Sequence, residues 1–168
     1  MYMKEALRKK AKGKKGFTLV ELVIVIAVLA IIAAIAIPTV SNVINNANVT
    51  ADKSNAQSIE LAIKTAQSEV AANATHSSTK AETLINAKTG KIELLLTTYG
   101  VDPTTVGLGN DTDTTDKLKE GTSYHYFYNT TTGKVYSATA KTATDDIQLT
   151  KGTTVWTIKD TTLTVTAS

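Results

Sequence analysis

The sequence predicts an α+β fold in which one long N-terminal helix packs on an antiparallel β-meander of about four strands. Two observations predict this class. The first 73 residues carry an apolar run and then an apolar stripe at helical spacing, whereas the C-terminal third carries short β-prone runs between turn residues. With 168 residues and no cysteine, the chain has room for one globular domain that relies on packing alone.

Positive charge is concentrated at the start of the chain. Seven of the 18 Lys and Arg residues lie in residues 1–16, and the other 11 are outnumbered by 14 acidic residues. We therefore expect no nucleic acid to bind the globular part. The sequence shows no nucleophile–histidine–acid set, paired-carboxylate site, phosphate-binding glycine loop or metal cluster, so we predict neither an enzyme nor a cofactor.

The next element is a hydrophobic helix predicted over residues 17–44. It contains 16 consecutive apolar residues, from Leu22 to Ile37. This length is close to the about 20 residues that a helix needs to cross a bilayer. The basic tail marks the cytoplasmic side, so the rest of the chain is expected outside the cell. The alternative is an ordinary signal peptide cleaved after Ala34-Ile35-Ala36. The carboxylate of Glu21 argues against it, because a charge inside an apolar segment is costly and usually functional.

The residues from Lys15 to Leu22 read KGFTLVEL, and an apolar run and Pro38 follow them. This string resembles the class III signal of type IV pilins and related pseudopilins, and the resemblance covers residues 15–38. It implies the ladle-shaped pilin form of the α+β fold. The missing cysteines remove the C-terminal disulfide loop that is common in pilins of diderm bacteria, which favours a monoderm, clostridial source.

The resemblance also implies how the N-terminus is processed and used. A prepilin peptidase would cut between Gly16 and Phe17, release the leader of residues 1–16 and methylate the new Phe17 amine. Glu21 would then be the fifth mature residue, whose carboxylate needs a positive partner in a dry filament core. Because Phe17 and Glu21 are four residues apart, we expect them on one helical face, where a neighbour's amine can reach the acid. Pro38 matches the family's kinking proline, and a kink or local unwinding is expected there.

The head is predicted as residues 45–168, beginning with an amphipathic helix half that ends near residue 73. Apolar residues continue at intervals of three and four through this half, from Ile59 to Val70. This half should pack on the rest of the head, while the preceding half anchors the chain.

Residues 74–121 are predicted as a connecting loop region. Two stretches in it, Lys80 to Ala87 and Lys91 to Tyr99, have the pattern of short helices, and Thr89-Gly90 separates them. Asp111, Asp113 and Asp116 are spaced so that they could offer oxygens to calcium. Because the glycine and distal glutamate of an EF-hand are absent, a solvated acidic loop is the prediction.

Residues 122–168 are predicted to form the β-meander. Short β-prone runs alternate there with turn residues. The runs are Tyr124 to Tyr128, Val135 to Ala138, Ile147 to Leu149, Val155 to Ile158 and Leu163 to Val165. The three tyrosines of the first run share one strand face. They could be exposed for adhesion, but cross-strand packing is the more common arrangement and is what we predict.

Three function classes follow. The leading one is a structural pilin that polymerises with other copies, through its N-terminal helix, into an extracellular type IV pilus for adhesion, aggregation or twitching motility. Its partners would be the prepilin peptidase, the inner-membrane assembly platform and, before assembly, the membrane itself. The second is a pseudopilin of a type II secretion or DNA-uptake system. The third, a conventional secreted binding domain, fits the charged apolar segment poorly.

Overall fold

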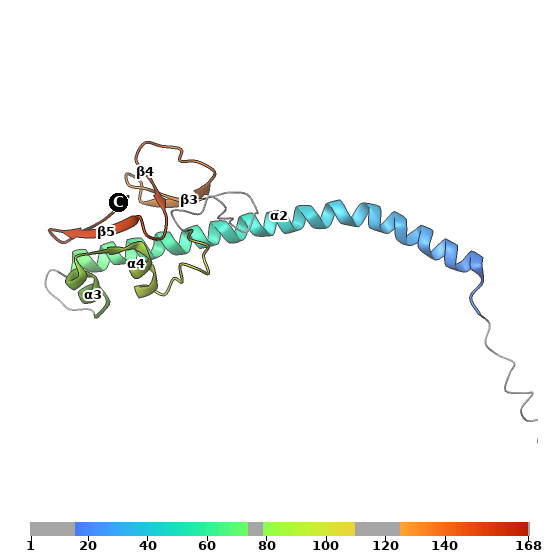
Figure 1. The fold of residues 1–168 in the computed structure, drawn as a ribbon, viewed down its shortest axis with the longest axis horizontal. Helices are drawn as coiled ribbons and strands as arrows, with labels where there is room; N and C mark the ends of the chain where they lie inside the picture. The colour runs from blue at the N-terminus through green and yellow to red at the C-terminus, as the bar shows by residue number, and fades with distance from the viewer. Residues whose placement is uncertain (1–15, 74–78, 110–124, 168) are drawn as a thin grey trace, which may run out of the picture. The chain divides into compact units, whose positions relative to one another are not determined.

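The computed structural model of the protein describes residues 16–73, 79–109 and 125–167. These residues fall into two compact units, one ending at Ile44 and the other beginning at Asn45. A long N-terminal helix is followed by antiparallel sheets of three strands each, which confirms the predicted α+β class (Figure 1).

The long helix, α2, runs from Leu19 to Ala72 and comprises 54 residues. Up to Ala47 every described residue is exposed, so no other described residue covers the apolar side chains of this part of the helix. In the second unit the helix is amphipathic, and its buried apolar residues recur at intervals of three and four. They are Ala56, Ile59, Ala62, Ile63, Ala66 and Val70.

Both short helices predicted in the connecting region are present, as α3 (Thr79–Ala87) and α4 (Ile92–Thr98). The stretch between them is a strand, β1 (Thr89–Lys91), rather than the simple separator that we expected. Gly90 lies opposite Trp156 in this pairing. A Cβ at Gly90 would lie 2.8 Å from the indole Nε1, so glycine is the residue that lets the ring pack against this backbone.

The remaining strands form two hairpins and one additional strand. They are β2 (His125–Asn129), β3 (Lys134–Ala138), β4 (Asp146–Leu149), β5 (Thr154–Lys159) and β6 (Thr162–Ala167). One sheet has the order β3-β2-β4 and the other β1-β5-β6, and every pair is antiparallel.

The predicted single meander of about four strands is therefore corrected to two separate sheets. β4 does not continue the meander beyond β3 but returns to the other side of β2. The β5–β6 hairpin pairs with β1, which lies before both hairpins in the sequence. Local turn signals identify hairpins, but they carry no information about which distant strand completes a sheet.

The core of the second unit lies between the amphipathic half of α2, helix α4 and the inner faces of the sheets. Ile59, Leu95 and Trp156 are all at 0% exposure there. Tyr126 and Tyr128 are also buried, at 1% and 4% exposure, which confirms that they pack rather than present their rings. Tyr124 lies outside the described residues.

Candidate processing and assembly segment

The start of α2 is held by a reciprocal pair of side-chain bonds between Thr18 and Glu21. The Thr18 hydroxyl accepts the backbone N–H of Glu21 at 3.2 Å, and Glu21 Oε2 accepts the backbone N–H of Thr18 at 2.8 Å. The same hydroxyl donates to Oε2 at 2.9 Å. This is a capping box, in which two otherwise unpaired N–H groups of the first helical turn are satisfied.

The capping box places Phe17 outside the helix. Gly16, Phe17 and Thr18 are not helical, and the Phe17 side chain is 89% exposed. The expectation that Phe17 and Glu21 share a helical face is therefore wrong, because the helix begins only at Leu19. The sequence contained the signal that we missed, since Thr18-Leu-Val-Glu21 has the spacing of a capping box.

Glu21 is left with one oxygen for another partner. Both bonds from Thr18 reach Oε2, and Oε1 makes no hydrogen bond to any residue that the structure describes. The carboxylate is thus turned toward the start of the helix, beside the residues of the predicted cleavage position. Its part in assembly stays a prediction.

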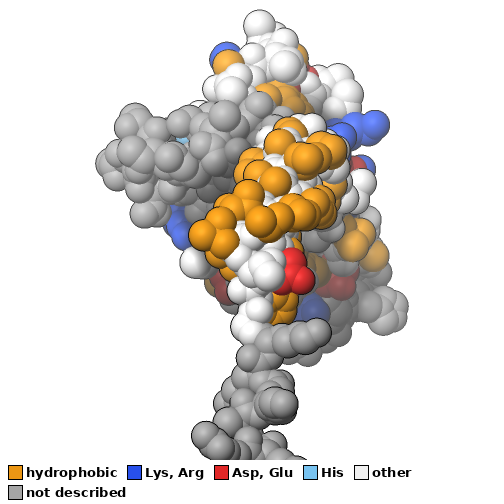
Figure 2. Space-filling view, turned by 90° about the vertical axis from the view of Figure 1, so that its right-hand side faces the viewer, with side chains coloured by type: hydrophobic (Ala, Val, Ile, Leu, Met, Phe, Trp, Pro, Cys, Tyr) orange, Lys and Arg blue, Asp and Glu red, His pale blue; other side chains and the backbone are white. Residues whose placement is uncertain are grey.

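The helix beyond Glu21 presents an exposed hydrophobic surface. The large apolar side chains from Leu19 to Ile44 are 48–79% exposed, and Figure 2 shows hydrophobic side chains gathered over the helix on that face. Among the described residues one helix, α2, is long and apolar enough to cross a membrane. A hydrophobic surface of this extent needs lipid or other protein chains around it.

Pro38 lies inside α2, and the helix continues through it. The unwinding considered from the sequence is absent here. Proline has no N–H for the carbonyl four residues earlier, which here is that of Ala34. Two hydroxyls close to Pro38 donate to other carbonyls. Thr39 Oγ1 donates to the Ile35 carbonyl at 3.0 Å, and Ser41 Oγ donates to the Ile37 carbonyl at 3.2 Å. These two bonds therefore add to the helix around Pro38 but do not replace the bond that the Ala34 carbonyl lacks.

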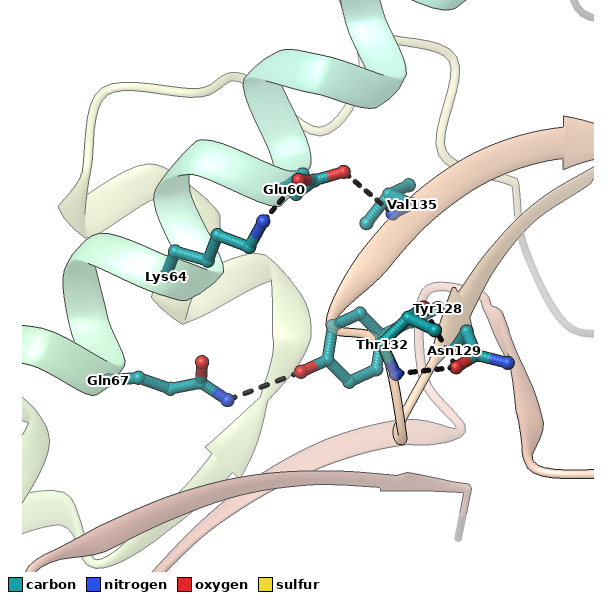
Figure 3. A network of polar contacts seen from close by, with 7 residues as sticks. All are labelled: Glu60, Lys64, Gln67, Tyr128, Asn129, Thr132 and Val135. Atoms are coloured by element: carbon teal, nitrogen blue, oxygen red, sulfur yellow. Dashed lines mark hydrogen bonds and ion pairs between the residues drawn. The ribbon is translucent and has the colours of Figure 1, made fainter.

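In the second unit, polar contacts join α2 to the β2–β3 hairpin (Figure 3). Glu60 Oε2 accepts the backbone N–H of Val135 at 3.0 Å, and Glu60 also forms an ion pair with Lys64. Gln67 Nε2 donates to the Tyr128 hydroxyl at 3.2 Å. Partial burial raises the pKa of Glu60, but hydrogen bonds from Lys64 and Val135 outweigh it and hold this pKa below its usual value.

A second polar cluster surrounds Asp146, which is 7% exposed. Its carboxylate accepts the Tyr136 hydroxyl, the Asn129 side-chain amide at 2.8 Å and the Thr142 backbone N–H at 3.0 Å. The Tyr136 bond is the main reason why the pKa of Asp146 falls to about 2. The cluster thus ties the β4 start to the β2–β3 hairpin.

The structure brings no metal-binding group together among the residues that it describes. The acidic loop with Asp111, Asp113 and Asp116 lies outside the described residues, so its predicted solvated state stays a prediction.

The comparisons with known proteins identify the N-terminal segment. A family model described as the prokaryotic N-terminal methylation motif matches residues 11–37. These residues carry the class III signal of type IV pilins and prepilins. No curated protein and no solved structure matches the chain. The motif supports a type IV pilin-like or pseudopilin precursor, a structural kind of protein, and the apolar helix is consistent with membrane anchoring.

Proposed function

We propose that the protein is a subunit of a type IV pilus, which polymerises through α2 into a surface filament for adhesion, aggregation or motility. The observation that carries the proposal is the N-terminal methylation motif, which leads directly into a helix with an exposed hydrophobic surface. The prepilin peptidase would remove residues 1–16 and methylate Phe17, and the inner-membrane platform would assemble the mature subunits.

The exposed apolar side chains of α2 supply the driving force for insertion into the membrane before assembly and for helix packing in the filament afterwards. Fully burying one Val, Leu or Ile side chain contributes about 1.5–3 kcal/mol, and α2 exposes such residues along its whole first half. Before assembly the bilayer would cover them, and in the filament neighbouring helices would. Small residues such as Ala30, Ala33 and Ala34 permit close approach between helices.

Glu21 would then direct how subunits dock. Oε2 is held by Thr18, and Oε1 has no hydrogen-bond partner among the described residues. A newly released Phe17 amine of a neighbouring subunit would pair with Oε1. In a dry core this contact would set the axial register of each added subunit. The capping box contributes by orienting the carboxylate toward the side from which that amine would come.

Two measurements on surface material test the proposal. Intact-mass analysis of sheared filaments should find a chain of residues 17–168 that begins with N-methylphenylalanine. Electron microscopy should show long filaments that disappear when the gene is deleted. A mature chain beginning at Ile37 would contradict the proposal and indicate conventional secretion, whereas correct processing without long filaments would indicate a pseudopilin.

A further inference from the structure

The β3-β2-β4 sheet buries an aromatic residue on the face that is turned away from the core. Tyr126 and Tyr128 of β2 belong to the core cluster. Phe127 lies between them and points to the opposite face, because successive side chains of a strand alternate. It is only 3% exposed, although it is not part of that cluster. Its ring stacks on that of Tyr136, its partner in β3, with 5.6 Å between the ring centroids.

The segment that follows β3, residues 139–144 and here called the strap, lies against Phe127. A hollow of about 560 Å³ is lined by Phe127 on the sheet and by residues 139–141 of the strap, among others. Five of the six strap residues are exposed, and Ala143 is half-buried. The strap therefore buries no side chain of its own, and the hollow leaves space between it and the sheet. Little apolar packing would be lost if the strap moved.

One carboxylate holds the strap in place. Asp146, the first residue of β4, accepts the backbone N–H groups of Thr142, at 3.0 Å, and of Ala143. The Tyr136 hydroxyl donates to the same carboxylate oxygen and accepts the Thr142 hydroxyl at 2.9 Å. No other N–H of the strap donates to a residue that the structure describes. The hydrogen bonds that the strap donates thus converge on Asp146 and on the hydroxyl that Asp146 holds.

The strap ends at a residue with different partners. Asp145 accepts the Thr130 N–H at its backbone carbonyl, at 3.3 Å, and the Thr131 N–H at its carboxylate, also at 3.3 Å. These bonds fix Asp145 to the turn between β2 and β3, whether or not residues 139–144 move.

We propose that the strap opens as a unit while the rest of the second unit stays folded, and that the Asp146 carboxylate is the latch that keeps it closed over Phe127. Local opening occurs where few apolar contacts and few hydrogen bonds have to be given up, as in this segment. The pairing of β2 with β3 and with β4 does not involve the strap. The proposal concerns the second unit alone and does not rest on filament assembly.

Opening would also change what this face exposes. Phe127 meets the His125 ring edge-on, at 6.5 Å between centroids, on the side away from Tyr136 in the sequence of β2. Without the strap beside them, the stacked rings of Phe127 and Tyr136 would become accessible to solvent. The accessibility of the Phe127 ring therefore reports opening independently of the hydrogen bonds.

The first test measures amide hydrogen exchange of the full chain in detergent micelles. In the wild type, the amides of Thr142 and Ala143 should exchange faster than those of β2, because strap opening needs no global unfolding. Asp146→Asn removes the charge and turns one accepting oxygen into a donor. We expect exchange at Thr142 and Ala143 to quicken about tenfold, since hydrogen bonds to a charged group are lost. Exchange in β2 should stay unchanged.

Asp145→Asn is the matched control. It makes the same chemical change one residue earlier, at a side chain that accepts the Thr131 N–H and no N–H of the strap. Exchange at Thr142 and Ala143 should stay at the wild-type rate in this variant.

Tyr136→Phe provides the second variant, which decides the question even where Asp146→Asn fails to fold. It keeps the stacked ring and removes only the hydroxyl that bonds Thr142 and Asp146. Exchange at Thr142 should quicken about fivefold, because neutral hydrogen bonds are lost. A soluble paramagnetic reagent should broaden the Phe127 ring signals more strongly in this variant, and trypsin should cut faster after Lys141 in the strap.

Three outcomes would overturn the proposal. Wild-type exchange at Thr142 and Ala143 as slow as in β2 would show that the strap opens only when the whole unit unfolds. Unchanged exchange in both latch variants would show that Asp146 and Tyr136 do not hold the strap. Equally fast exchange in Asp145→Asn would show that any loss of charge at this turn has the same effect.

Discussion

No residue between Gly16 and Ile44, in the first unit, is buried. In the second unit, which begins at Asn45, the side chains of Trp156, Leu95 and Ile59 have no exposed surface. The first unit is one helix whose apolar side chains face outward on every side. The second unit packs its apolar side chains around a core of its own. Changes in the first unit should therefore affect what the chain associates with, and changes in the second should affect whether it folds.

The largest effect expected on folding comes from Trp156→Ala in the second unit. Truncating a fully buried aromatic side chain typically costs about 3–5 kcal/mol, a large part of the stability of a domain this small. Denaturant unfolding of the full chain in detergent should show a strongly lowered midpoint. Leu61→Ala, at a side chain that is 67% exposed, should leave the midpoint nearly unchanged. A similar loss in both variants would mean that the core does not centre on Trp156.

An effect of similar size, but on assembly alone, is expected for Glu21→Ala in the first unit. In the proposed filament, this substitution would leave the Phe17 amine of a neighbouring subunit buried without a partner, which should prevent docking of new subunits. Membrane levels and cleavage after Gly16 should stay near normal, because the span becomes more apolar. Sheared filaments should be few or absent, and Glu21→Gln should behave alike because it keeps shape but loses charge.

Co-expression gives the stricter form of this experiment. A Glu21→Ala chain produced beside the wild type should be under-represented in filaments relative to its share of the membrane pool. Equal incorporation would show that the carboxylate is not an assembly contact, and the first unit would then associate through apolar packing alone.

A smaller effect is expected for Gly90→Ala, again in the second unit. The new Cβ would lie 2.8–2.9 Å from three atoms of the Trp156 ring, so either the ring or β1 must move. Overpacking of this kind costs about 1–3 kcal/mol. The substitution should lower the unfolding midpoint less than Trp156→Ala does. Gly100→Ala, which meets no atom within 4 Å but sits at a φ of 79°, separates backbone strain from the clash. Unchanged stability in Gly90→Ala would contradict the close packing.

Thr18→Val tests the capping box at the start of the first unit. Losing an N-cap side chain costs about 0.5–2 kcal/mol, which should fray the first helical turn without disturbing the head. Amide hydrogen exchange in micelles should quicken at residues 19–22 only. Thr18→Ser keeps the hydroxyl and should restore the wild-type pattern. Faster exchange throughout the helix would mean that Thr18 stabilises more than the first turn.

The smallest effect expected is a pH dependence of the second unit. The pKa of Asp146 in the folded protein is about 2, mainly because of the hydrogen bond from the Tyr136 hydroxyl. The pKa of an aspartate in an unfolded chain is about 3.9. The depressed pKa stabilises the fold above the unfolded value, and this contribution is lost as pH falls toward 2. Asp146→Asn should reduce the acid dependence of the unfolding free energy between about pH 4 and pH 2. An unchanged slope would show that other carboxylates account for the acid sensitivity.

Periodicity predicted the parts of the molecule that depend on local sequence. Ile59, Ala62, Ile63, Ala66 and Val70 were expected on one helical face, and all are buried. It could not predict that Gly90 would lie against Trp156, because that pairing joins residues far apart in the chain. The capping box could have been predicted from the spacing of Thr18 and Glu21. We interpreted Glu21 only as an assembly residue and therefore missed its local role as a capping side chain.

The capping box at the start of α2 lies in the part of the chain that the proposed cleavage would leave in place. Thr18 and Glu21 both lie after the proposed Gly16–Phe17 cleavage position, so the precursor and the mature chain would share the same first turn. Gly16, Phe17 and Thr18 are not helical, so cleavage between Gly16 and Phe17 would break no hydrogen bond of α2. Removing the basic tail would then leave a single terminal amine one residue before an intact helix cap. The charge at this end of the chain would change, and the first turn of the helix would not.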